Sequence, residues 1–125
     1  MPGCAAARGT HIAHSATTPL HSTALSTSLT ILHLLAPAPV GGLQTVVAML
    51  ARAQLGAGHR VIVAPTLSRP EEGEHFLASM NGSGVEVEPL SVPRRRYLRE
   101  AALIRALCRT RNVSIVHTHG YRSDL

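Results

Sequence analysis

Two histidines near the end of the chain are the residues best suited to chemistry. His117 and His119 stand two residues apart in the run IVHTHG. On an extended segment such residues point to the same side, and an imidazole there can exchange protons near neutral pH or bind a metal. Two ligands are too few for a typical zinc site, and Asp124 is the one acid nearby, so we assign no metal. His119 is the functional candidate, whereas His117 fits a structural role.

The Gly41-Gly42 pair is a second candidate site, because it follows an apolar run and precedes a helical pattern. Such a loop presents unpaired backbone amides and the positive end of a helix dipole, which together attract anions. A glycine pair can equally serve only to bring a helix close to a strand, and both interpretations stay open. The chain has neither G-x-G-x-x-G nor a Walker lysine, which argues against the usual dinucleotide and P-loop sites.

A third candidate is the arginine segment, which we define as Arg94, Arg95, Arg96 and Arg99. These side chains crowd the start of a predicted helix, where positive charge is unfavourable. They are either solvated or in contact with phosphate groups or an anionic membrane surface, in keeping with a formal net charge of +5. Aromatic residues make up only 2% of the chain, too few to stack bases, so no nucleic-acid partner is expected.

The elements that must position these residues follow an alternating pattern. Strands are predicted at residues 29–35, 59–64, 85–88 and 113–116, and His33 alone interrupts the first apolar run. Helices are predicted at residues 43–55, 72–81 and 94–110, with residues 89–93 as a linker. The residues expected to face inward from these helices are Leu43, Val46, Val47, Leu50 and Gln54; Phe76, Leu77 and Met80; and Tyr97, Ala101, Ile104 and Cys108, flanked by Leu98 and Leu107.

This β-α-β-α-β-α-β order predicts an α/β fold, a Rossmann-like doubly wound parallel sheet with strand order 3-2-1-4. Connections then leave the first and fourth strands toward opposite faces, and a crevice opens between their carboxyl ends. Gly41-Gly42 follows the first strand and His117 to Gly120 follow the fourth. We therefore expect the two loops to meet at one ligand site.

Composition along the chain predicts its domain organisation and its location in the cell. Residues 1–28 lack acids and periodicity and are expected to be a disordered extension, while residues 29–125 form one domain. Cys4 and Cys108 form no ligand pair, and no stretch is apolar enough to span a bilayer. These features predict a cytoplasmic protein, with peripheral contact at the inner face of the membrane as an option for the arginine segment.

Three segments in order resemble the N-terminal domain of glycosyltransferase family 4: GGLQTVV at residues 41–47, LGAGHRV at residues 55–61, and IVHTHG at residues 115–120. The resemblance implies a GT-B fold and retaining transfer of a sugar from a nucleotide-sugar donor to a sugar, lipid or small-molecule acceptor. It implies no bound metal and no cofactor. By this resemblance Gly41 and Gly42 approach the donor phosphates or the acceptor, His119 lies near the reacting sugar, and His117 lies below it.

A full family member also has a second domain, which carries the nucleotide pocket, and the resemblance ends before it. The sequence therefore predicts a truncated, incomplete N-terminal domain, the acceptor-side half of the enzyme, inactive without the second domain. The alternative is a non-enzymatic basic α/β module that binds phosphorylated partners through the arginine segment.

Overall fold

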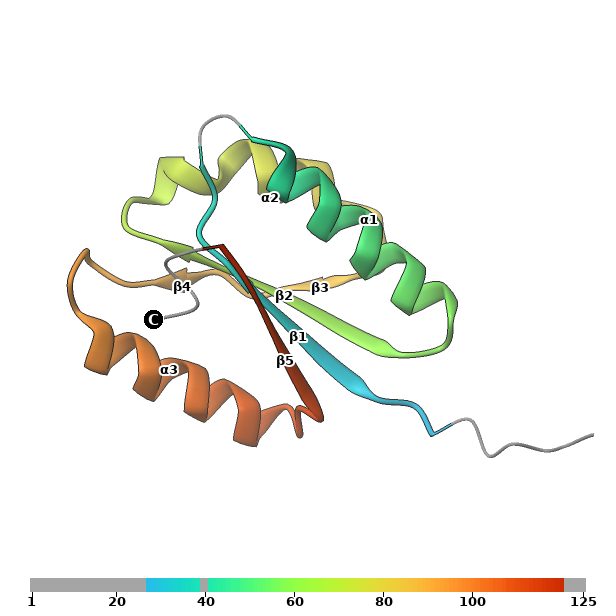
Figure 1. Cartoon of the computed structure of the whole chain (residues 1–125). Helices are drawn as coiled ribbons and strands as arrows, with labels where there is room; N and C mark the ends of the chain where they lie inside the picture. The colour runs from blue at the N-terminus through green and yellow to red at the C-terminus, as the bar shows by residue number, and fades with distance from the viewer. Residues whose placement is uncertain (1–26, 39–40, 121–125) are drawn as a thin grey trace, which may run out of the picture.

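The computed structural model describes residues 27–38 and 41–120, which form one parallel sheet with helices on both faces (Figure 1). The strands are β1 (Thr30–Leu35), β2 (Arg60–Leu67), β3 (Glu86–Val87), β4 (Leu90–Ser91) and β5 (Ile115–His119). The helices are α1 (Gly42–Gly56), the 3-10 turn η1 (Pro70–Gly73), α2 (Glu74–Met80) and α3 (Tyr97–Thr110). The predicted extension at residues 1–28 lies almost wholly outside the described residues.

The strand order is β3-β2-β1-β5, and β4 also pairs with β2. All pairings are parallel, so the predicted order 3-2-1-4 and the α/β fold class are confirmed. α1 and α2 cover one face of the sheet and α3 covers the other (Figure 1). β1 lies between β2 and β5, which puts the carboxyl ends of β1 and β5 side by side.

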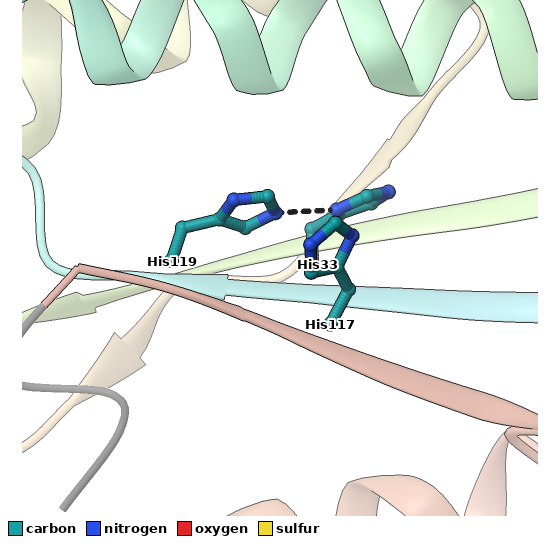
Figure 2. A group of neighbouring side chains, drawn as sticks. All are labelled: His33, His117 and His119. Atoms are coloured by element: carbon teal, nitrogen blue, oxygen red, sulfur yellow. Dashed lines mark hydrogen bonds between the residues drawn. The ribbon is translucent and has the colours of Figure 1, made fainter.

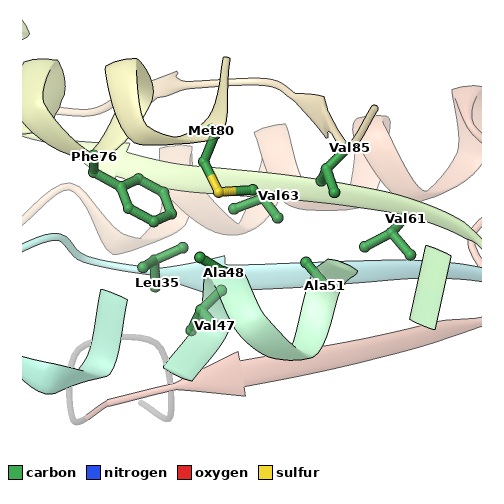
Figure 3. Close-up of a cluster of buried hydrophobic side chains, with 9 residues drawn as sticks. All are labelled: Leu35, Val47, Ala48, Ala51, Val61, Val63, Phe76, Met80 and Val85. Carbon is green, nitrogen blue, oxygen red and sulfur yellow. The ribbon is translucent and has the colours of Figure 1, made fainter. Parts of the chain in front are cut away.

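The two faces of the sheet carry separate aliphatic cores, because successive strand residues point to opposite sides. Under α1 and α2 the core consists of Leu35, Val47, Ala48, Ala51, Val61, Val63, Phe76, Met80 and Val85 (Figure 3). Under α3 it consists of Leu32, Leu34, Ile62, Ala64, Leu90, Val92 and Leu107. The helices are therefore held against the sheet mainly by the burial of aliphatic side chains.

Two predicted boundaries on the β2 side of the sheet were wrong. β2 does not stop before Pro65 but continues to Leu67. The carbonyls of Val63 and Leu67 accept hydrogen bonds from Glu88 and Val92, and Pro65 lies midway between them, at the gap between β3 and β4. No ladder N–H is needed there, so proline is tolerated. The predicted linker at residues 89–93 accordingly contains β4.

The inward face of α1 is rotated relative to the prediction, whereas that of α2 is not. In α1 the buried residues are Val47, Ala48 and Ala51, whereas Val46 is exposed. The alanines let the helix lie close to the sheet, and Val46 is turned away by one helical step. The first turn of α2 is a 3-10 turn, but its inward residues Phe76 and Met80 are as predicted.

In α3 the predicted stripe was wrong at its N-terminal end. Tyr97 and Leu98 are exposed, the latter by 90%, and Glu100 and Leu107 are the buried residues. Leu103, Ile104 and Cys108 complete the inward face. The helix begins at Tyr97 rather than at Arg94, so most of the arginine segment precedes it. None of the described helices combines the length and apolarity needed to cross a membrane.

Candidate functional site: a histidine cluster at the ends of β1 and β5

Strand pairing brings three histidines together that are far apart in the sequence. β5 runs beside β1 with His117 opposite His33 and His119 opposite Leu35. Because side chains alternate along a strand, His33, His117 and His119 all project toward the face covered by α1. We call these three residues the histidine cluster (Figure 2). The histidines at 117 and 119 lie inside β5, whereas the sequence placed them in the loop after a strand at residues 113–116.

The rings of the cluster are in direct contact. Nδ1 of His33 lies 2.8 Å from Nε2 of His119, a hydrogen-bond distance. The ring centroids are 5.1 Å apart for His33 and His119, 5.2 Å for His33 and His117, and 4.1 Å for His117 and His119. Figure 2 shows the hydrogen bond and the His117 ring beside it. The three imidazoles therefore form one unit.

Gln54 of α1 anchors this unit from the helix side. Its Oε1 lies 2.6 Å from Nε2 of His33. An amide oxygen can only accept, so Nε2 of His33 carries the proton, and Nδ1 accepts from the Nε2–H of His119. The sequence placed Gln54 on the inward face of the helix, which is correct, but as part of an apolar stripe. Its role is to fix the tautomer and orientation of His33.

Burial controls the charge of His33. His33 is fully buried, and this burial lowers the pKa of its imidazole. The hydrogen bond to Gln54 opposes the shift, and the nearby His117 adds to it. His33 is thus held in its neutral form. His119 is 9% exposed and His117 is exposed, so the cluster is closed at the His33 end and open to solvent at the His117 end.

Sequence reasoning missed His33 as a functional residue. The signal was present, because His33 is the one polar residue in the apolar run that follows Thr30 in β1. A buried polar side chain requires hydrogen-bonding partners, and here two groups supply them. The pairing of β1 with β5 sets the register that brings His33 beside His119, and this pairing cannot be read from the local sequence.

The start of α1 lies against the end of β5. Gly120 has a φ of 85°, and a Cβ there would lie 3.3 Å from Cδ2 of Leu43. The glycine loop and the His119 segment therefore meet, as the crevice argument predicts. Gly41 and Gly42 differ from Gly120, because a Cβ on either would have no described atom within 4 Å. Packing against the described part of the chain does not require glycine at these two positions.

A groove of about 380 Å³ opens between α1 and α2. Its lining includes Gly41 and Gln44 at the start of α1, Arg52 farther along α1, and Ser79 of α2. The volume is within the range of small-molecule pockets. The histidine cluster does not line this groove, so the concave surface and the imidazoles are separate features that approach each other near the glycine loop.

The arginine segment lies apart from the histidine cluster, at the start of the helix that covers the opposite face of the sheet (Figure 1). All four arginines are exposed, and none forms an ion pair with another described residue. Arg95 has a φ of 67°, and a shallow hollow of about 340 Å³ lies along the segment. The structure gathers no other candidate residue around these side chains.

Comparison with known proteins agrees with the fold. The crystal structure of a glycosyltransferase from Rickettsia africae ESF-5 is similar, with a TM-score of 0.64 and 20% sequence identity. The similarity covers 76% of this chain and 24% of that chain, so the present chain spans about a quarter of its length. No curated protein matches significantly. The family model of Glycosyltransferase Family 4 matches residues 40–125, which is most of the chain. The chain belongs to glycosyltransferase family 4.

Proposed function

We propose that the chain is the acceptor-side half of a retaining glycosyltransferase that moves a sugar from a nucleotide-sugar donor to a sugar, lipid or small-molecule acceptor. Family membership supports the transferase class. The observation that carries the proposal is the position of His119, at the carboxyl end of β5 beside the start of α1. In open α/β sheets this end of the strands is where ligands bind.

In this proposal His119 contacts the reacting sugar, and His33 and Gln54 position it. The proton on Nε2 of His119 is directed at His33, and that of His33 is directed at Gln54. In a neutral His119 with this proton on Nε2 the lone pair is on Nδ1, which is the ring atom able to accept a hydrogen bond, and we propose that it binds a sugar hydroxyl. A fixed ring orientation spares the site the entropy of ordering the side chain during transfer. His117 lies beside this pair and supports it by ring contact.

Gly41 and Gly42 approach the donor phosphates in this proposal. The first turn of α1 has no acidic residue and no side-chain cap, so its amides and dipole favour an anion. Packing within the described chain does not explain why positions 41 and 42 are both glycine. Close approach of a ligand to the backbone does explain it.

A second domain is expected to supply the nucleotide pocket. The matched crystal structure is about four times as long as the segment that this chain covers. We therefore expect these 125 residues alone not to transfer sugar. The proposal also places the reaction in the cytoplasm, with the arginine segment available to the anionic inner face of the membrane.

The test is to join the chain to a nucleotide-binding domain of a family 4 enzyme and to measure sugar transfer. His119→Asn should lower kcat by at least about 100-fold, the effect of removing one well-placed polar group at a reacting centre. The matched control Arg94→Gln should stay within about threefold of the parent, because a solvated surface side chain contributes little. A His119→Asn chimera that transfers sugar at the parent rate would refute the assignment.

The runner-up is a non-enzymatic module that binds phosphorylated partners. The exposed arginines, which form no ion pair with a described residue, and the hollow along them favour it. The same pair of variants separates the two functions. Under the alternative, Arg94→Gln weakens binding of a phosphorylated peptide while His119→Asn leaves that binding unchanged.

A further inference from the structure

We infer that His33, His117 and His119 form a binding site for one divalent transition-metal ion. Each residue offers one ring nitrogen, and these three atoms all lie within 4.8 Å of one another. Three imidazoles on one metal, with a fourth position left to water, is a common zinc arrangement. In the sequence only His117 and His119 stand close together, which is too few ligands for a metal. The pairing of β1 with β5 adds His33 as the third. The inference does not depend on the proposed transferase function.

The spacing is close to that of a bound ion. With Zn–N bonds of about 2.0–2.1 Å, tetrahedral ligand atoms are about 3.4 Å apart. The 2.8 Å separation of His33 and His119 would widen slightly, and the wider separations, up to 4.8 Å, would shrink by up to about 1.4 Å. His117 is exposed, so its ring can rotate without disturbing the core.

Gln54 supplies the outer support that metal-bound histidines usually have. A ligating histidine generally donates its second ring N–H to an oxygen, which fixes the tautomer. His33 does so already, since its Nε2 lies 2.6 Å from Oε1 of Gln54 and its Nδ1 faces His119.

The ligand chemistry limits which ions fit. The cluster contains only imidazole nitrogens, which suit Zn²⁺, Ni²⁺ and Cu²⁺, whereas Mg²⁺ and Ca²⁺ prefer oxygen ligands. The exposed His117 side gives an ion access from solvent. Binding also replaces the His33–His119 hydrogen bond, because both use the same two nitrogens. The proton on Nε2 of His119 must then move to Nδ1, so the metal-bound chain and the proposed acceptor role of His119 Nδ1 are two mutually exclusive states of the site.

The test is calorimetric titration of the untagged 125-residue chain with ZnCl₂, after treatment with a chelator. We expect one ion per chain. His117→Asn should weaken binding by at least about 100-fold, more than the loss of an outer partner. Gln54→Leu should weaken it by about 10–100-fold. The matched control His75→Asn, which replaces an exposed histidine of α2, should leave the affinity unchanged.

A second control separates the cluster from the histidines of the N-terminal segment. Replacement of His11, His14 and His21 by Asn should leave the one-ion titration intact. The proposal is overturned if the parent chain takes up no Zn²⁺, or if uptake survives His117→Asn and disappears in this triple variant. His119→Gln, with Co²⁺ absorption as the readout, gives an independent test. It should abolish the tetrahedral Co²⁺ spectrum of the parent, and its persistence would contradict the assignment.

Discussion

The histidine cluster and the arginine segment were both singled out by residue type, yet the fold treats them in opposite ways. The histidines come from β1 and β5 and are brought into ring contact by strand pairing. The arginines are adjacent in sequence, but they remain exposed at the start of α3 without ion pairs to described residues. Proximity along the chain thus gathers no other candidate residue around the arginines, whereas register between strands brings three histidines into contact.

Energetic cost separates the two regions as well. His33 occupies a fully buried strand position, where a hydrocarbon side chain would need no partners. It is retained there with two hydrogen bonds that only the folded arrangement supplies. Exposed arginines need no such support. His33 therefore depends on the folded arrangement for its partners, whereas the arginines do not, and three substitutions test that difference.

The largest effect is expected from His33→Ala. The change leaves a cavity in the sheet and removes the partner of Gln54 Oε1 and of His119 Nε2 at this site. Together these losses should lower the free energy of unfolding by about 2–4 kcal/mol, measured by urea denaturation. His117→Ala is the matched control, because His117 is exposed, and it should cost less than about 1 kcal/mol. Equal losses in the two variants would mean that burial does not distinguish members of the cluster.

An intermediate effect is expected from Gly120→Ala at the meeting of β5 and α1. The φ of 85° at Gly120 disfavours alanine, and the added Cβ would lie only 3.3 Å from Cδ2 of Leu43. The expected cost is about 1–2 kcal/mol of unfolding free energy. Gly41→Ala is the control, since its backbone is extended and its Cβ would meet no described atom. It should change stability by no more than about 0.5 kcal/mol, and a larger loss would show that packing does require that glycine.

Much of the fold was predictable, because hydrophobic period and turn residues act locally. The apolar run at residues 29–35 and the Gly41-Gly42 break locate β1 and the start of α1, and the alternation of elements gives the strand order. The predicted boundaries that were wrong depend on contacts with neighbouring strands. Pro65 fits a strand only because the partner ladder is interrupted there, and β4 exists only because β2 extends far enough to pair with it.

Only some residues of the candidate site could be predicted, because local sequence patterns mark some of them and tertiary contacts bring in the others. His119 and His117 attract attention through their spacing, and Gly41-Gly42 through its place between a strand and a helix. His33 has no local signature beyond being polar in an apolar run. Gln54 looks like one more position on the inward face of α1. Their contact depends on the register of β1 with β5 and on the rotation of α1, and neither can be read from local sequence.

The smallest effect is expected in the arginine segment, from Arg95→Gly. Arg95 has a φ of 67°, a conformation that costs a side-chain-bearing residue about 1–2 kcal/mol, part of which the flexibility of glycine cancels. The variant should be more stable by about 0.5–1 kcal/mol in urea denaturation. Asn112→Gly is the control, because its φ is 50° but asparagine tolerates this region, so its change should stay within about 0.5 kcal/mol. A loss of stability in Arg95→Gly would mean that this guanidinium helps to hold the fold, and the contrast with the histidine cluster would then fail.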